Sequence, residues 1–121
     1  MILNNYIRDI PDFPKKGIIF KDITPLLKNK EAYYYAIEEF KKRIFKRKID
    51  YIIGIESRGF ILGAALAQSL NCGFVPIRKK GKLPYKVISE TYDLEYGKDT
   101  LEVHIDALES NNNVVLIDDV L

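Results

Sequence analysis

Three short, uninterrupted apolar runs most constrain what this chain can fold into. They span residues 51–55, 74–77 and 114–117, and none of them alternates charged with apolar side chains. Runs of this length are typical of strands buried on both faces of a parallel sheet. A helical pattern rich in small residues, 59–70, separates the first two runs. This order predicts an α/β fold with right-handed crossovers and a mostly parallel sheet flanked by helices.

The first thirty residues have a different character, because proline and glycine recur in them at Pro11, Pro14, Gly17 and Pro25. Such punctuation predicts an extended arm, or hood, over residues 1–30, with Pro25 near the start of a short helix. Residues 31–121 would then form the core domain.

An amphipathic helix and a β-hairpin complete the predicted core. Residues 31–46 place their apolar side chains on one stripe at helical spacing. Residues 90–94 and 100–105 alternate polar with apolar side chains around Gly97–Asp99, which predicts a hairpin. Pro76, within the second apolar run, hints at an edge strand.

Composition narrows the class of protein further. The chain has 47% apolar and 30% charged residues, a net charge of +2 and a single cysteine, Cys72. A disulfide framework and a zinc site built on paired cysteines are excluded, and a reducing, cytoplasmic setting fits best. We expect no signal peptide and no membrane span. The basic cluster at residues 41–48 suggests a nucleic-acid partner, but the low net charge favours a solvated helix end.

Each predicted core strand is followed by charged residues. Arg58 follows the first strand, residues 78–82 form a basic loop after the second, and Asp118 and Asp119 follow the third. Read alone, these are a surface ion pair, a solvated turn and a strand end. Ligands of open α/β sheets bind at the carboxyl ends of the strands, so we expect one crevice with a basic rim and an acidic pair. This crevice suits a ligand with phosphates at one end and hydroxyls or Mg²⁺ at the other.

Several of these residues lie in segments that resemble the motifs of a known protein family. Residues 114–121 resemble the opening of the ribose-phosphate motif of type I phosphoribosyltransferases. Four further segments resemble the adenine phosphoribosyltransferase branch of that family: the hood (13–27), the pyrophosphate loop (57–60), the mobile basic loop (78–84) and the hairpin turn (94–97). Lys16 replaces a usual proline and Lys21 a frequent arginine. We expect little effect, because the family reads the base with the backbone there.

The resemblance implies transfer of phosphoribosyl from phosphoribosyl pyrophosphate to adenine, giving AMP and pyrophosphate, with Mg²⁺ as cofactor in a homodimer. It implies that the basic residues Arg58, Arg78, Lys79 and Lys82 hold pyrophosphate. Asp118 and Asp119 would serve the ribose hydroxyls, directly or through Mg²⁺. Adenine would contact Ile19, Phe20, the Lys21 backbone and Tyr96. Glu95 would handle a proton at adenine N7, and His104, the single histidine, receives no role.

In the family the ribose-phosphate motif continues into a loop that binds the 5′-phosphate, whereas this sequence stops at Leu121. We therefore expect the C-terminal part of the sheet to be missing and residues 114–117 to form a possible bare apolar edge. Two alternatives stay open: an inactive fragment, or a non-catalytic regulator that binds a purine or phosphoribosyl pyrophosphate. The presence of both Glu95 and Arg58 favours an enzyme lineage.

Overall fold

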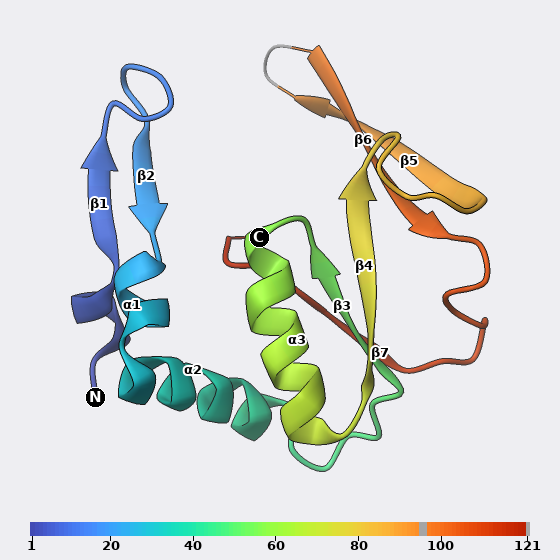
Figure 1. The fold of residues 1–121 in the computed structure, drawn as a ribbon, viewed down its shortest axis with the longest axis horizontal. Coiled ribbons are helices and arrows are strands. Elements are labelled where there is room, and N and C mark those ends of the chain that lie inside the picture. The colour runs from blue at the N-terminus through green and yellow to red at the C-terminus, as the bar shows by residue number, and fades with distance from the viewer. Residues whose placement is uncertain (95–96, 121) are drawn as a thin grey trace. The chain divides into compact units, whose positions relative to one another are not determined.

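The computed structural model describes residues 1–94 and 97–120, and the chain divides into two compact units, Met1–Phe45 and Lys46–Leu121 (Figure 1). Each unit is described by itself. None of the helices in the described residues combines the length and the apolar character that crossing a bilayer would require.

The first unit is a hairpin followed by two helices. A 3-10 turn, η1 (Leu3–Tyr6), leads into strands β1 (Arg8–Pro11) and β2 (Ile19–Asp22), which pair antiparallel. The predicted extended arm is therefore a two-stranded hairpin, and its loop includes a cis peptide bond between Phe13 and Pro14.

Helices α1 (Thr24–Lys28) and α2 (Lys30–Arg43) complete the unit. Pro25 lies in the first turn of α1, as the sequence predicts. The Asn29 side chain caps α2 by accepting hydrogen bonds from the backbone N–H groups of Glu31 and Ala32, at 3.1 and 2.9 Å. The helix ends at Arg43, three residues before the predicted end at residue 46. Leu26, Ala32 and Ala36 form the small core that holds these helices together.

The second unit is built on a five-stranded sheet with strand order β5-β6-β4-β3-β7. Strands β3 (Tyr51–Ile55), β4 (Gly73–Lys79) and β7 (Val114–Ile117) run parallel, and β5 (Val87–Leu94) and β6 (Gly97–His104) form an antiparallel hairpin. Helix α3 (Arg58–Leu70) connects β3 to β4. The predicted α/β class is confirmed, with three parallel strands extended by the hairpin.

Apolar packing between α3 and the sheet forms the core of this unit. Ile52 and Leu66 are almost completely buried. A Cβ on Gly63 would lie 2.7 Å from the Phe74 ring and 3.0 Å from Ile117 Cγ2, so the helix approaches the sheet too closely for a larger side chain. Asn71 ends α3 in the left-handed conformation, at φ 57°.

Two expectations about the strands are wrong. Pro76 does not mark an edge strand, because β4 lies between β3 and β6; the ladder to β6 begins only at Arg78. The hairpin does not turn at Gly97–Asp99, because Gly97 pairs with Leu94 and already belongs to β6; the two strands instead connect within residues 94–97, the segment that resembles the family's hairpin turn. Residues 95 and 96 connect the two strands and lie outside the described residues.

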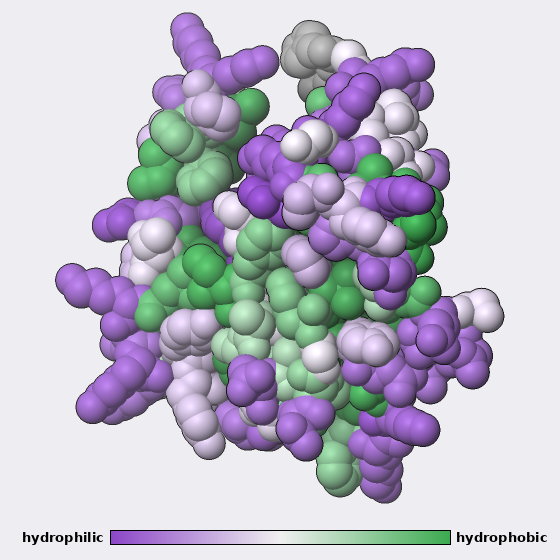
Figure 2. Space-filling view, turned by 45° about the vertical axis from the view of Figure 1, so that its right-hand side comes forward, coloured by the Kyte–Doolittle hydropathy of each residue, from purple (hydrophilic) through white to green (hydrophobic). Residues whose placement is uncertain are grey.

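Strand β7 is less buried than its apolar sequence predicts. Within the described residues it lies at one edge of the sheet and pairs with β3, and its Val114 and Leu116 side chains are 40% and 46% exposed. Ile117, which packs against Gly63 of α3, is buried. In the space-filling view, hydrophobic (green) residues reach the surface among hydrophilic (purple) ones (Figure 2). The expectation of cover on both faces of this strand is thus met only at Ile117.

Candidate active site at the strand ends

The carboxyl ends of β3, β4 and β7 meet at one edge of the sheet. The three strands are parallel and in register, with Ile55 beside Ile77 and Gly54 beside Ile117. The charged residues that follow each strand are therefore brought together, which is the arrangement that binds ligands in open α/β sheets.

Arg58 and Asp119 form the centre of this edge. Arg58 is the first residue of α3, and its Nη2 lies 2.6 Å from Asp119 Oδ2. The Asp119 side chain is only 7% exposed, and within the described residues no aligned hydrogen bond reaches Oδ2. The contact is therefore an ion pair in which the carboxylate oxygen keeps acceptor capacity. The prediction that the arginine and the acidic pair share one place is confirmed.

Gly59 allows this close approach of helix and strand. A Cβ at Gly59 would lie 2.8 Å from the Ile117 carbonyl oxygen and 3.2 Å from Asp118 Oδ1. Asp118 Oδ1 accepts a hydrogen bond from the Asp119 backbone N–H at 2.9 Å. Burial raises the pKa of Asp118, and the Asp119 carboxylate raises it further, against the lowering effects of that hydrogen bond and of Arg58. A cation beside the pair would relieve this strain on the ionised form.

The basic loop, defined as residues 78–82, is gathered around one carboxylate. It is a loop only in part, because β4 continues past the predicted end at residue 77 and includes Arg78 and Lys79. Glu56 Oε1 accepts hydrogen bonds from Arg78 Nε at 3.2 Å and from the Lys79 backbone N–H at 3.0 Å, and Glu56 Oε2 accepts one from Lys82 Nζ. Mainly through the bond from Lys82, and despite its burial, the pKa of Glu56 falls to about 2. Sequence reasoning assigned no role to Glu56. Its position directly after β3, beside the end of β4, was the available signal.

A second carboxylate ties the basic loop to the hairpin. Glu102 Oε1 accepts a hydrogen bond from the Gly81 N–H at 2.8 Å, and Oε2 accepts one from Ser89 Oγ at 2.6 Å. Glu102 is buried, and these two bonds lower its pKa. Gly81 adopts φ +84°, a conformation that favours glycine. Gly81 is thus needed for the shape of the loop as well as for any movement of it.

All four basic residues predicted to hold pyrophosphate lie within 4.0 Å of a carboxylate of the chain itself. The pairs of Arg58, Arg78 and Lys82 are described above, and the fourth pair joins Lys79 Nζ and Asp99 Oδ2, at 4.0 Å. A polyanionic ligand would therefore compete with internal carboxylates for these cations.

The predicted adenine contacts lie in the first unit, on strand β2. Ile19 is largely exposed, Phe20 packs edge-on against Phe13 with ring centroids 5.2 Å apart, and Lys21 Nζ lies 2.6 Å from Asp9 Oδ1. The other two predicted residues, Glu95 and Tyr96, lie outside the described residues.

The acidic pair suits Mg²⁺ better than a metal held by protein ligands alone. The described part of the chain contains no cluster of three His, Cys, Asp or Glu side chains. Mg²⁺ is usually bound by one or two carboxylates together with substrate phosphates and waters. The under-bonded Asp119 Oδ2 and the raised pKa of Asp118 fit such a site.

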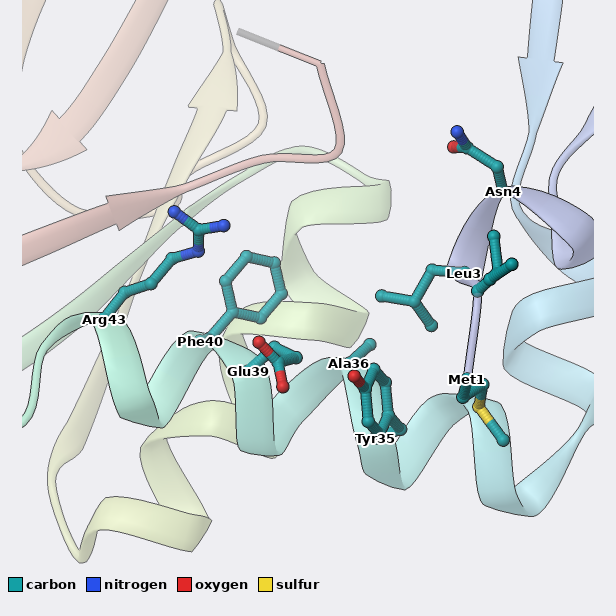
Figure 3. A pocket seen from close by; sticks show the side chains of 9 residues that line it. Met1, Leu3, Asn4, Tyr35, Ala36, Glu39, Phe40 and Arg43 are labelled. Carbon is teal, nitrogen blue, oxygen red and sulfur yellow. The ribbon is translucent and has the colours of Figure 1, made fainter.

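Two pockets have no residue of the strand-end site in their lining. One, of about 430 Å³ in the first unit, is lined largely by apolar side chains of the N-terminal segment and α2, among them Leu3, Tyr35 and Phe40 (Figure 3). The other, of about 650 Å³, lies beside the first residues of β7 and is lined in part by Arg47, Lys48 and Asn113. Neither pocket contains a predicted site residue.

Three parallel strands with basic groups and an acidic pair at their carboxyl ends define an α/β protein of the class whose ligands bind at that edge of the sheet. The family is given by comparison, because the model of the phosphoribosyl transferase domain matches residues 23–121. The chain belongs to the phosphoribosyltransferase family.

Its relatives agree closely in sequence and structure. The adenine phosphoribosyltransferase of Brachyspira hyodysenteriae is 60% identical over all 121 residues, which correspond to 71% of that protein. The crystal structure of adenine phosphoribosyltransferase from Thermoanaerobacter pseudethanolicus has a TM-score of 0.93 at 54% identity, covering 97% of this chain and 68% of that one. The Saccharomyces cerevisiae enzyme, complexed with an imino-altritol bisphosphate and adenine, has a TM-score of 0.90 at 40% identity, covering 97% and 69%.

Proposed function

We propose that this protein is a pentosyltransferase that transfers phosphoribosyl from phosphoribosyl pyrophosphate to adenine, giving AMP and pyrophosphate in purine salvage. The supporting observation is the meeting of Arg58 with the Asp118–Asp119 pair at the strand ends, in a chain 60% identical to an adenine phosphoribosyltransferase. This identity does not favour the non-catalytic regulator.

Different residues bind different parts of phosphoribosyl pyrophosphate. Arg58 and the N-terminus of α3, with Arg78, Lys79 and Lys82 of the basic loop, stabilise the negative charge that develops on the departing pyrophosphate. Asp118 and Asp119 hold the ribose hydroxyls, and they are the residues that would hold Mg²⁺. The ion, when bound, neutralises phosphate charge and orients the substrate.

Adenine N9 attacks ribose C1 as the bond from C1 to the pyrophosphate oxygen breaks. Ile19, Phe20 and the Lys21 backbone, with Tyr96, position the purine by stacking and hydrogen bonding. Glu95 takes or relays the proton at adenine N7. The basic loop covers the reacting groups and excludes water, which would otherwise hydrolyse the activated sugar.

We further propose a cytoplasmic homodimer in which some basic residues act in the neighbouring subunit's site. Sedimentation velocity tests the dimer, and a species of 14.0 kDa at all concentrations would contradict it.

Adenine-dependent release of pyrophosphate from phosphoribosyl pyrophosphate tests the activity. The assay is run on the chain alone and on the chain continued past Leu121 with the corresponding segment of a curated relative. Release without adenine, or by neither protein, would contradict the proposal. Binding of phosphoribosyl pyrophosphate without release would indicate the regulator instead.

A further inference from the structure

Glu56 accepts bonds from two cations of the basic loop, Arg78 and Lys82, yet has no role toward the sugar. It directly follows β3 and precedes Ser57 and Arg58, where α3 begins. The Glu56 side chain is only 10% exposed, while those of Arg78 and Lys82 are 35% and 48% exposed. The fixed partner is therefore the carboxylate, and the cations are the groups with freedom to move.

The contacts of Glu56 imitate those of a phosphate group. Its two oxygens accept three charged or backbone donors, from Arg78, Lys79 and Lys82. Charge-assisted bonds of this kind are what the same cations offer to phosphate oxygens. One cation donor cannot bond fully to Glu56 and to pyrophosphate at the same time.

We propose that Glu56 is a positioning residue that competes with pyrophosphate for Lys82 and Arg78, holding the basic loop at the end of β3 and promoting release of the pyrophosphate product. This inference rests on the proposed function, because it takes these cations to be pyrophosphate ligands. The apparent affinity for a ligand is reduced by the fraction of molecules whose binding groups are engaged elsewhere.

Competition and a merely structural role predict opposite changes in the affinity for pyrophosphate when Glu56 is replaced. If Glu56 competes, Glu56→Gln removes the competitor, so pyrophosphate binds more tightly and leaves more slowly. If Glu56 only orients the cations for the ligand, the same substitution weakens binding. With Lys82 engaged by Glu56 in about nine molecules of ten, the expected tightening is about tenfold.

The test measures binding of inorganic pyrophosphate in the presence of Mg²⁺ by calorimetry. We expect Glu56→Gln to lower the dissociation constant about tenfold. In the enzymatic assay we expect a lower inhibition constant for pyrophosphate and a lower kcat, since product release limits many enzymes of this kind. In a Lys82→Met background, Glu56→Gln should change the affinity much less, because the two residues act through one contact.

Two controls separate competition from simple removal of a negative charge. Glu90→Gln removes an exposed carboxylate of β5 that pairs with none of these cations in the described part of the chain, and we expect it to tighten binding less than about threefold. Glu56→Asp keeps the charge but shortens the side chain by one methylene, so it should lose Lys82 and tighten binding partially. This variant carries the test if Glu56→Gln does not fold.

The outcomes distinguish the two proposals. If the wild-type protein binds pyrophosphate and Glu56→Gln binds it equally or more weakly, the competition is wrong and the proposed function stands. An equal tightening by Glu90→Gln would also overturn the competition. If the wild-type protein does not bind pyrophosphate at all, the proposed function itself fails.

Discussion

The two halves of the strand-end site are held in different ways. The half formed by α3 and β7 is set by close packing, with Gly59 against the Ile117 carbonyl and a nearly buried Asp119 beside Arg58. The half formed by the basic loop consists of partly exposed cations paired with Glu56, and Glu102 holds the loop backbone through the Gly81 N–H. Packing fixes a position and ion pairs at a surface can rearrange, so the first half is suited to constant recognition and the second to covering and releasing a ligand.

Arg58 tests the packed half most severely. Arg58→Ala removes the guanidinium that we propose stabilises the charge on the departing pyrophosphate, and we expect kcat/KM for AMP formation to fall about 10²- to 10³-fold. Lys79→Ala, in the adaptable half, should cost about tenfold or less. The exposed Arg47, which adjoins the other pocket, provides the matched control, Arg47→Ala. Equal losses for Arg58→Ala and Lys79→Ala would erase the difference between the halves.

Gly59 tests whether packing sets the position of the acidic pair. Gly59→Ala places a methyl group 2.8 Å from the Ile117 carbonyl oxygen, and we expect a loss of about 1–3 kcal/mol in the free energy of unfolding, with a raised KM for phosphoribosyl pyrophosphate. Gly63→Ala meets the Phe74 and Ile117 side chains, so it should reduce stability and leave KM unchanged. Urea unfolding and initial-rate kinetics measure the two effects. An unchanged KM in Gly59→Ala would show that the pair is placed independently of this contact.

The two aspartates should respond to neutralisation with opposite signs. Asp119→Asn removes the charge that pairs with Arg58 at 2.6 Å and should lower the free energy of unfolding by about 1–3 kcal/mol. The raised pKa of Asp118 means that the fold favours its protonated form. That stabilisation is present below the ordinary aspartate pKa and is lost as the pH rises through the raised value. Asp118→Asn should therefore stabilise the protein at neutral pH. Urea unfolding at pH 7 checks both variants, and a shared sign would contradict the assignment.

The smallest expected effect on stability is that of Glu102→Gln, which changes the carboxylate that holds the backbone of the basic loop. Its pKa is lowered below the ordinary 4.5 by the bonds from Ser89 and Gly81, so its contribution to stability is present above that value and is lost as the pH falls below it. The stability gap between wild type and Glu102→Gln should thus be widest near neutral pH and narrow on acidification. Thermal unfolding across this pH range measures it, and a gap that grows in acid would be the wrong result.

The local sequence pattern predicted the packed half of the strand-end site well. The continuous apolar run of Tyr51–Ile55, the helix after Arg58 and the strand ending in Asp118 all follow from periodicity and from the rule that ligands bind at strand ends. The meeting of Arg58 with Asp119 followed from these three predictions together.

The parts that sequence reasoning missed depend on which strands become neighbours. Pro76 hinted at an edge strand, but its strand gained β6 as a second partner beyond the proline. Val114 and Leu116 lie in a run typical of strands buried on both faces, yet both are exposed; the expected bare apolar edge at residues 114–117 is confirmed within the described residues. The role of Glu56 needed the register that sets the ends of β3 and β4 side by side, which no local pattern contains.

The brief pairing of β4 with β6 has a mechanical consequence. The two strands share a ladder at only Arg78 with Glu102 and Lys79 with Leu101, whereas β6 pairs with β5 along its whole length. A further backbone bond, from the Lys80 N–H to the Thr100 carbonyl oxygen at 3.2 Å, continues this contact into the basic loop. The few residues that attach the hairpin to the sheet are thus also those that hold the loop, so a change in the pairing of β4 with β6 would reach the loop through Glu102 and Gly81.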